Sequence, residues 1–341
     1  MKDNFLNNLF TMTKTRPFAI FQAFIVTILW SSSWPIIKFG LEIENLPPFI
    51  FAGLRYVTAS VILIVAVLVS PRHRRELKTI TKKWWLILIF YGLIFYTLTQ
   101  GAQFLGLVYL PAITVSLLLS FTPILVLIIA VFTIKEKPSF IQIIFVLTAL
   151  GGALLYFIPS LNLNLTTSII IGLVVVIIGV LANAFSTIVG RSINQKQVLS
   201  PLVITAVSML IGSIILLVVG FSVEGVPSIS LTGVGYILWL SVVNTALAFT
   251  LWNHSMQRLR AVEISIINNT MLFQITILVV IFLSERPTPL EWVGLAIVAI
   301  SGLLLPLFKS KDKESTERNE IEDTQNSDES KDQKADLKPQ F

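Results

Sequence analysis

Cysteine is absent from this 341-residue sequence, and only two histidines, His73 and His254, are present. Without cysteine the chain can form neither a disulfide framework nor a thiolate metal site. Two histidines are also too few for a histidine-rich metal site. We therefore expect no metal and no other cofactor.

Charged residues are also scarce, at 13% of the chain against 55% hydrophobic residues. This charged fraction is about half that of a soluble domain, too small to cover a water-exposed surface of this size. The bulk of the chain is therefore expected to lie in a lipid bilayer. The net charge of +6 is explained by loop placement, described below, so no nucleic-acid partner is expected.

Long apolar runs dominate the sequence from residue 18 to residue 308. A spanning helix needs roughly 20 apolar residues to cross about 30 Å of hydrocarbon, and these runs are continuous rather than alternating as in a membrane β-barrel. The fold class predicted is an all-α integral membrane protein with ten transmembrane helices. They are expected at 18–37, 49–69, 84–104, 112–134, 140–158, 169–189, 201–220, 233–252, 263–283 and 290–308.

Basic residues are distributed unevenly among the loops. If the N-terminus is cytoplasmic, the inside segments hold 15 Lys and Arg residues and the outside loops hold only two, Lys38 and Arg286. Cytoplasmic loops are enriched in Lys and Arg. We therefore expect a multi-pass protein of the cytoplasmic membrane, with a cytoplasmic N-terminal segment (1–17) and a disordered cytoplasmic tail (309–341).

The two halves of the chain contain the same short Glu-Pro motif at corresponding positions. Glu136 and Pro138 recur as Glu285 and Pro287, 149 positions later, each time in a short turn between apolar runs. This predicts a duplication into repeats at 18–158 and 169–308. Because each repeat has five spans, an odd number, the second must be inverted relative to the first. Inverted repeats are a transporter architecture with the substrate site near the midplane between them.

Polar and aromatic side chains inside the spans are the candidates for a substrate site, because hydrocarbon leaves polar groups unsatisfied. Tyr96, Gln100 and Gln103 follow helical spacing and predict one polar stripe. The alternative is that such groups hydrogen-bond between helices and only hold them together. The candidate substrate-binding residues are Trp30, Ser31, Trp34, Tyr96, Gln100, Gln103, Asn183, Asn244, Trp252, Asn269 and Gln274.

Two charged residues stand out as candidates for gating or ion pairing. Arg55 lies several residues inside the second span, where it either pairs with a helix-end carbonyl or a substrate carboxylate or snorkels outward. Glu263 opens the ninth span, where a carboxylate complements the helix N-terminus. Capping and proton carriage are both open for Glu263.

This pattern resembles the drug/metabolite transporter superfamily, specifically its EamA-type members. The resemblance rests on the ten-span duplication, on the segment from Leu29 to Lys38, on Arg55, and on Glu136 and Glu285. It implies transport of small organic metabolites such as amino acids. The fifth and tenth helices would pack at the periphery, where a homodimer is one arrangement. Family members often carry Gly and Asn where this chain has Ser31 and Ser33, a departure that bears on pocket chemistry.

We therefore expect a secondary transporter that moves a small, amino-acid-like, neutral or zwitterionic metabolite by alternating access, with export as the direction. The alternatives are an intramembrane enzyme and a multidrug or cation exporter. No nucleophile, base or metal constellation is apparent in the sequence, which argues against an enzyme. No acidic residue lies near the centre of a span, which argues against a cation antiporter.

Overall fold

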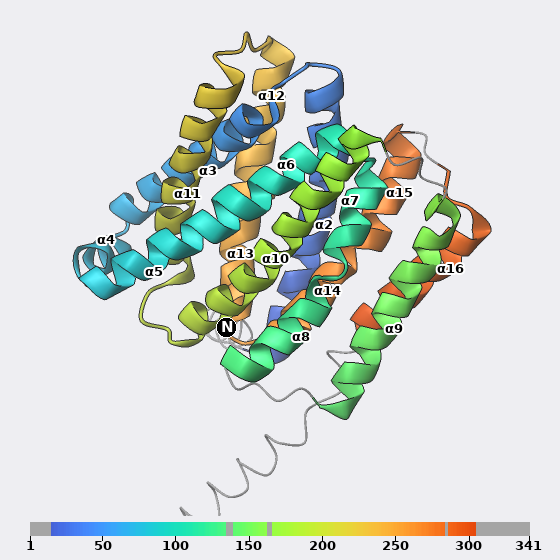
Figure 1. Ribbon diagram of the computed structural model, residues 1–341. Coiled ribbons are helices and arrows are strands. Elements are labelled where there is room, and N and C mark those ends of the chain that lie inside the picture. Colours follow the sequence, from blue (N-terminus) through green and yellow to red (C-terminus); the bar gives the residue numbers. More distant parts are fainter. Residues whose placement is uncertain (1–14, 134–138, 162–165, 284–285, 305–341) are drawn as a thin grey trace, which may run out of the picture.

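The computed structural model describes residues 15–133, 139–161, 166–283 and 286–304 as a helical bundle (Figure 1). Every regular element in these ranges is a helix, as the sequence predicts. The turns with Glu136 and Glu285, residues 1–14 and the tail at 309–341 lie outside the described residues.

Helices of the first half coincide with the predicted apolar runs. One additional short helix, α4, follows the second run and consists mainly of basic and polar residues. The elements are α2 (Arg16–Glu42), α3 (Pro48–Val69), α4 (Pro71–Lys78), α5 (Lys82–Gly92), η1 (Leu93–Thr99), α6 (Gln100–Tyr109), α7 (Ala112–Leu119), α8 (Thr122–Thr133), α9 (Phe140–Phe157) and η2 (Ile158–Leu161).

The second half repeats this order. Its elements are α10 (Thr167–Gln195), α11 (Pro201–Glu224), α12 (Leu231–Ser241), η3 (Val242–Leu247), α13 (Ala248–Met256), α14 (Ala261–Asn269), α15 (Met271–Leu283) and α16 (Pro289–Leu304).

Eight helical stretches in the described residues are long and apolar enough to cross a membrane. Two of the ten predicted spans correspond instead to shorter apolar helices, Ala112–Val126 and Pro289–Ser301. The structure therefore supports a multi-pass membrane protein, and the number of ten spans stays a prediction.

Hydroxyl side chains fix where several helices begin. A Ser or Thr hydroxyl accepts a hydrogen bond from the backbone N–H three residues later, which satisfies one of the unpaired donors of the first helical turn. These N-caps are Thr15, Thr81, Ser139, Thr166, Ser200 and Ser230.

Two pairs of irregularities recur at the same spacing in the two halves. The π-helical segments η1 and η3 begin at Leu93 and Val242, which are 149 positions apart. The breaks α7/α8 and α14/α15 also correspond, because α8 and α15 begin 149 positions apart. At each break a hydroxyl donates to the carbonyl three residues earlier: Ser120 to Leu117 (2.5 Å) and Thr270 to Ile267 (2.7 Å).

Helices of the two halves interleave. The discontinuous pair α7–α8 lies beside α14–α15 and runs in the opposite direction, so α7 packs on α15 and α8 packs on α14 (Figure 1). Helix α3 packs along α11, and α9 packs along α16. The α9–α16 contact is close, since a Cβ atom on Gly152 would lie 2.8 Å from the carbonyl oxygen of Gly294.

Candidate functional site

A cavity of about 70 Å³ lies inside the bundle. A single water needs about 10–15 Å³ on this scale, so the cavity has room for several waters or a small solute. Trp30 lies near the middle of α2 and Asn183 near the middle of α10, which places the cavity near the middle of the bundle. It is lined by Trp30, Ser33, Trp34, Arg55, Tyr56, Phe95, Thr99, Gln100, Gln103, Leu119, Asn183, Phe249, Asn268 and Met271.

Both helix breaks border this cavity. Leu119 is the last residue of α7, and Met271 is the first residue of α15. Two smaller cavities of about 30 and 20 Å³ adjoin it and share Asn268 as a lining residue. The three cavities therefore lie beside the breaks α7/α8 and α14/α15, which belong to different halves of the chain.

Arg55 is the cavity's charged wall residue and is only 2% exposed. Its Nε donates to the Thr245 hydroxyl (2.7 Å), and its Nη2 donates to the carbonyl oxygen of Asn244 (3.3 Å). Both acceptors belong to the π-helical segment η3, where the change in hydrogen-bond register displaces carbonyls from their usual partners. The guanidinium therefore pairs with a mid-helix segment and not with a helix end.

Most of the predicted site residues are brought together by the fold. Six of them line the cavity at Arg55, called the main cavity for its polar lining: Trp30, Trp34, Arg55, Gln100, Gln103 and Asn183. Two more line the adjoining cavities, Asn269 in one and Trp252 in the other. Substrate contact by these residues stays a prediction, since the structure contains no solute.

Three predicted residues instead connect α2 to the second half. The Asn244 amide donates to the Leu29 carbonyl and to the Ser32 hydroxyl. The Ser31 hydroxyl donates to Gln274 Oε1 (2.9 Å), and Gln274 Nε2 donates to the Thr27 hydroxyl (3.0 Å). Ser31, Asn244 and Gln274 therefore serve as inter-helix hydrogen-bonding residues here and do not line the described cavities.

Tyr96 also lies away from the cavity wall. The predicted stripe assumed a continuous α-helix, but Tyr96 falls within the π-helical segment η1. Because a π-helix has more residues per turn, Tyr96 points in a different direction from Gln100. Its ring is fully buried against Phe249, at 5.3 Å between ring centroids.

Sequence reasoning missed several wall residues. Tyr56 donates to Gln100 Oε1 (2.6 Å) and so fixes that amide. Phe95 and Phe249 are apolar residues in apolar runs, so nothing in the sequence separates them from core residues. Asn268 could have been predicted, because it is a polar residue within a span and directly precedes the predicted residue Asn269. The missed lining residues are Ser33, Tyr56, Phe95, Thr99, Leu119, Phe249, Asn268 and Met271.

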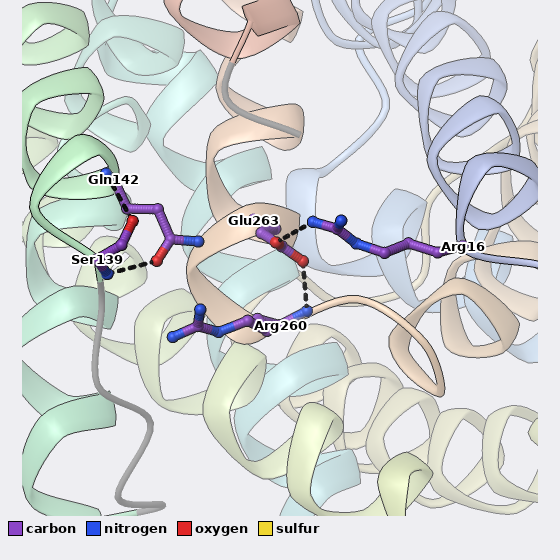
Figure 2. A network of polar contacts seen from close by, with 5 residues as sticks. All are labelled: Arg16, Ser139, Gln142, Arg260 and Glu263. Carbon is purple, nitrogen blue, oxygen red and sulfur yellow. Dashed lines mark hydrogen bonds and ion pairs between the residues drawn. The ribbon is translucent and has the colours of Figure 1, made fainter. Parts of the chain in front are cut away.

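Glu263 lies at one end of the bundle, two residues into α14. Its Oε1 accepts a charged hydrogen bond from Arg16 Nη2 (2.6 Å), and its Oε2 accepts from the backbone N–H of Arg260 (3.0 Å) (Figure 2). The carboxylate thus combines helix capping with an ion pair to the start of α2. On the neighbouring α9, Ser139 and Gln142 form a capping box.

No group of three or more His, Asp or Glu side chains within the described residues could hold a metal ion.

Comparison with known proteins gives a consistent family. The EamA-like transporter family matches residues 17–158 and again 170–307. The uncharacterized transporter YvbV of Bacillus subtilis (strain 168) is 27% identical over 241 residues, covering 70% of this chain and 74% of that protein. An uncharacterized transporter of Archaeoglobus fulgidus is 26% identical over 283 residues, covering 82% of this chain and 94% of its own.

A solved structure described as "Crystal structure of protein" has the same fold. Its TM-score is 0.71 at 16% sequence identity, and the match covers 86% of this chain and 97% of that one. Together with the apolar helices described above, these matches identify a multi-pass membrane transporter. The chain therefore belongs to the EamA-like transporter family.

Proposed function

We propose that this protein is a secondary transporter that moves a small, amino-acid-like, neutral or zwitterionic metabolite across the cytoplasmic membrane by alternating access, with export as the direction. The observation that carries the proposal is the polar cavity at the breaks of α7/α8 and α14/α15. Discontinuous helices at membrane depth expose backbone and side-chain polar groups, and transporters use them to bind substrate between repeats.

Inverted repeats at 18–158 and 169–308 are part of this proposal. The matching positions of η1 with η3 and of the two helix breaks support a duplication. The opposite directions of α7–α8 and α14–α15 support the inversion (Figure 1). In this arrangement both halves contribute to the wall of the central cavity, and rocking of one against the other would open it alternately to each side.

The Arg16–Glu263 pair supports a closed cytoplasmic side in this conformation. Arg16 precedes the first span, and Glu263 begins the ninth. Because Glu263 is only 2% exposed, its carboxylate is held by these partners and not by water. Release of this pair is the proposed step that opens the cavity toward the cytoplasm, so the predicted gating role belongs to Glu263.

Peripheral packing of α9 and α16 is also proposed. These helices pack mainly on each other, and the outward side of α9 presents Phe140, Ile144 and Leu147. Such a surface suits lipid or a second copy of the chain, and the homodimer predicted through these helices stays a proposal.

Transport can be tested with the purified full-length protein in proteoliposomes. Vesicles loaded with one unlabelled L-amino acid would be diluted into the same labelled amino acid, across a panel of all common side-chain classes. A carrier gives saturable, counterflow-stimulated accumulation that protein-free vesicles lack. Linear flux without counterflow for every member of the panel would contradict the proposed substrate class and mechanism.

A further inference from the structure

The charge of the cavity is set by one buried residue. Arg55 is the only charged residue in the described part of the chain that lines the main cavity. Both of its hydrogen-bond acceptors, the Thr245 hydroxyl and the Asn244 carbonyl, are neutral. Within the same described ranges, no Asp or Glu oxygen lies within 4.0 Å of its guanidinium. The main cavity wall therefore carries an uncompensated positive charge.

An uncompensated guanidinium at this depth is costly, so the surroundings must stabilise it. The planar group lies 5.1 Å from the ring centroid of Tyr56 and 5.9 Å from that of Phe104, within the range of cation–π attraction. Neutral oxygens and ring faces stabilise the cation without cancelling its charge. Charged residues within membrane spans mark substrate or ion pathways and normally have a counter-ion.

The guanidinium is also incompletely used. Its Nε and Nη2 have acceptors, and among the described residues no hydrogen bond is formed by Nη1. Arginine binds a carboxylate through two parallel N–H···O bonds. This requires N–H donors of the planar guanidinium to point toward the ligand. Because Arg55 lines the cavity, its charge acts directly on a solute placed there.

The cavities beside the one at Arg55 contain further polar groups that lack a partner. Unpartnered buried polar atoms border the adjoining cavities, where the described residues leave Ser265 Oγ and Asn269 Nδ2 without a hydrogen bond. Both side chains are more than nine-tenths buried, which makes unsatisfied groups costly unless water or a ligand pairs with them. Trp30 and Trp34 add aromatic rings to the wall of the cavity at Arg55.

We propose that Arg55 is the carboxylate-binding residue of this cavity, so the site takes small monocarboxylates, above all α-amino acids, and discriminates against solutes that lack a carboxylate. This inference rests on the proposed transport function, which it narrows to a substrate class. The volume of about 70 Å³ is several times what one water needs, which leaves room for a small solute. The same charge repels organic cations, which separates this site from that of a cation exporter.

Tryptophan fluorescence of the full-length protein in nanodiscs gives a binding test that needs no transport, since Trp30 and Trp34 line the cavity. Each L-amino acid of the panel would be compared with its carboxamide, in which a neutral amide replaces the carboxylate. We expect the acid to bind at least tenfold more tightly than the amide. A charged hydrogen bond of about 1.5–3 kcal/mol corresponds to roughly a 10- to 100-fold change in Kd.

Variants then assign the preference to Arg55. We expect Arg55→Gln to bind acid and amide equally and Arg55→Lys to keep part of the preference, because lysine retains the charge but not the fork. Arg258→Gln, at an exposed position, is the control and should bind like the natural chain. If Arg55→Gln does not fold, the acid–amide ratio of Arg55→Lys, compared with that of the natural protein, still tests the assignment to Arg55. Equal binding of acid and amide in the natural protein, or no binding of any panel acid, overturns the proposal.

Failure of this inference is distinguishable from failure of the proposed function. Arg55-dependent binding of acids without counterflow would refute transport while leaving the carboxylate site intact. Counterflow of a carboxylate-free solute that Arg55→Gln does not alter would refute the carboxylate site while leaving transport intact.

Discussion

Arg16 Nη2 lies 2.6 Å from Glu263 Oε1, and this contact joins residues 247 positions apart in the sequence. The carboxylate is 2% exposed, whereas the Arg16 side chain is 32% exposed. The pair connects the first turn of α2 to the first turn of α14 (Figure 2). Loss of either partner should weaken the packing of these two helix ends.

Arg16→Gln is predicted to open the cavity of about 20 Å³ lined by Ser265, which follows Glu263 by two residues on α14. Removing one partner of a fully buried pair costs about 3–5 kcal/mol, and partial exposure of Arg16 reduces this to about 1–2 kcal/mol. A shift of that size raises an open population roughly 5- to 30-fold. The readout is the labelling rate of Ser265→Cys, which lines the cavity, by a membrane-impermeant maleimide applied to the Arg16 side. The natural chain has no cysteine to interfere.

Arg258→Gln in the same Ser265→Cys background is the matched control, because it removes an exposed arginine near the same end. Its labelling rate should equal that of the parent. Equal rates for Arg16→Gln and Arg258→Gln would show that the Arg16–Glu263 pair does not hold this side closed.

A close backbone contact gives the second prediction. A Cβ atom on Gly92 would lie 2.3 Å from the carbonyl oxygen of Ser208, and a backbone atom cannot move aside as a flexible side chain can. Gly92→Val should therefore destabilise the packing of α5 on α11 by about 1–3 kcal/mol, the usual cost of overpacking. The measurement is thermal unfolding in detergent. Gly151→Val, where a Cβ has nothing within 4 Å, should unfold close to the natural protein; equal losses for both variants would refute the contact.

Thr245 is predicted to position Arg55. Its hydroxyl accepts from Arg55 Nε at 2.7 Å, and valine keeps the shape while removing the acceptor. Thr245→Val should therefore weaken carboxylate binding about 3- to 10-fold in the fluorescence titration, less than loss of a direct charged hydrogen bond, because Thr245 acts only through Arg55. Thr250→Val, on the same span but bonded to Ala246, is the control. An unchanged acid–amide ratio in Thr245→Val would show that Arg55 is positioned without it.

Much of the helical fold was predictable because it depends on local composition. The run at 49–69 became α3 (Pro48–Val69), since a continuous apolar stretch has few alternatives to a helix when its backbone must be satisfied internally. Similar reasoning found Gln100, Gln103 and Asn183, polar residues within apolar runs that do line the cavity.

The remaining features depend on contacts that no local pattern contains. The π-helical segment before Gln100 carries no proline or other marker, yet it turns Tyr96 away from the wall. Asn244 looked like a lining residue but bonds to the Leu29 carbonyl across 215 positions. The Arg16 partner of Glu263 was missed for the same reason, because pairing between distant helices is decided by the assembled bundle.

Membrane topology gives the last prediction. Asn45 follows α2 and Thr79 follows α4, and both side chains are exposed in the described structure. The excess of basic residues near Thr79 and their scarcity near Asn45 place these two positions on opposite sides of the membrane. In intact cells, an impermeant maleimide should label Asn45→Cys, and it should label Thr79→Cys only after permeabilisation. Ser230→Cys, which follows the seventh predicted span, should behave like Asn45→Cys. If Asn45→Cys and Thr79→Cys were labelled from the same side, a single crossing by α3 would be wrong, and with it the odd number of spans that makes the second repeat inverted.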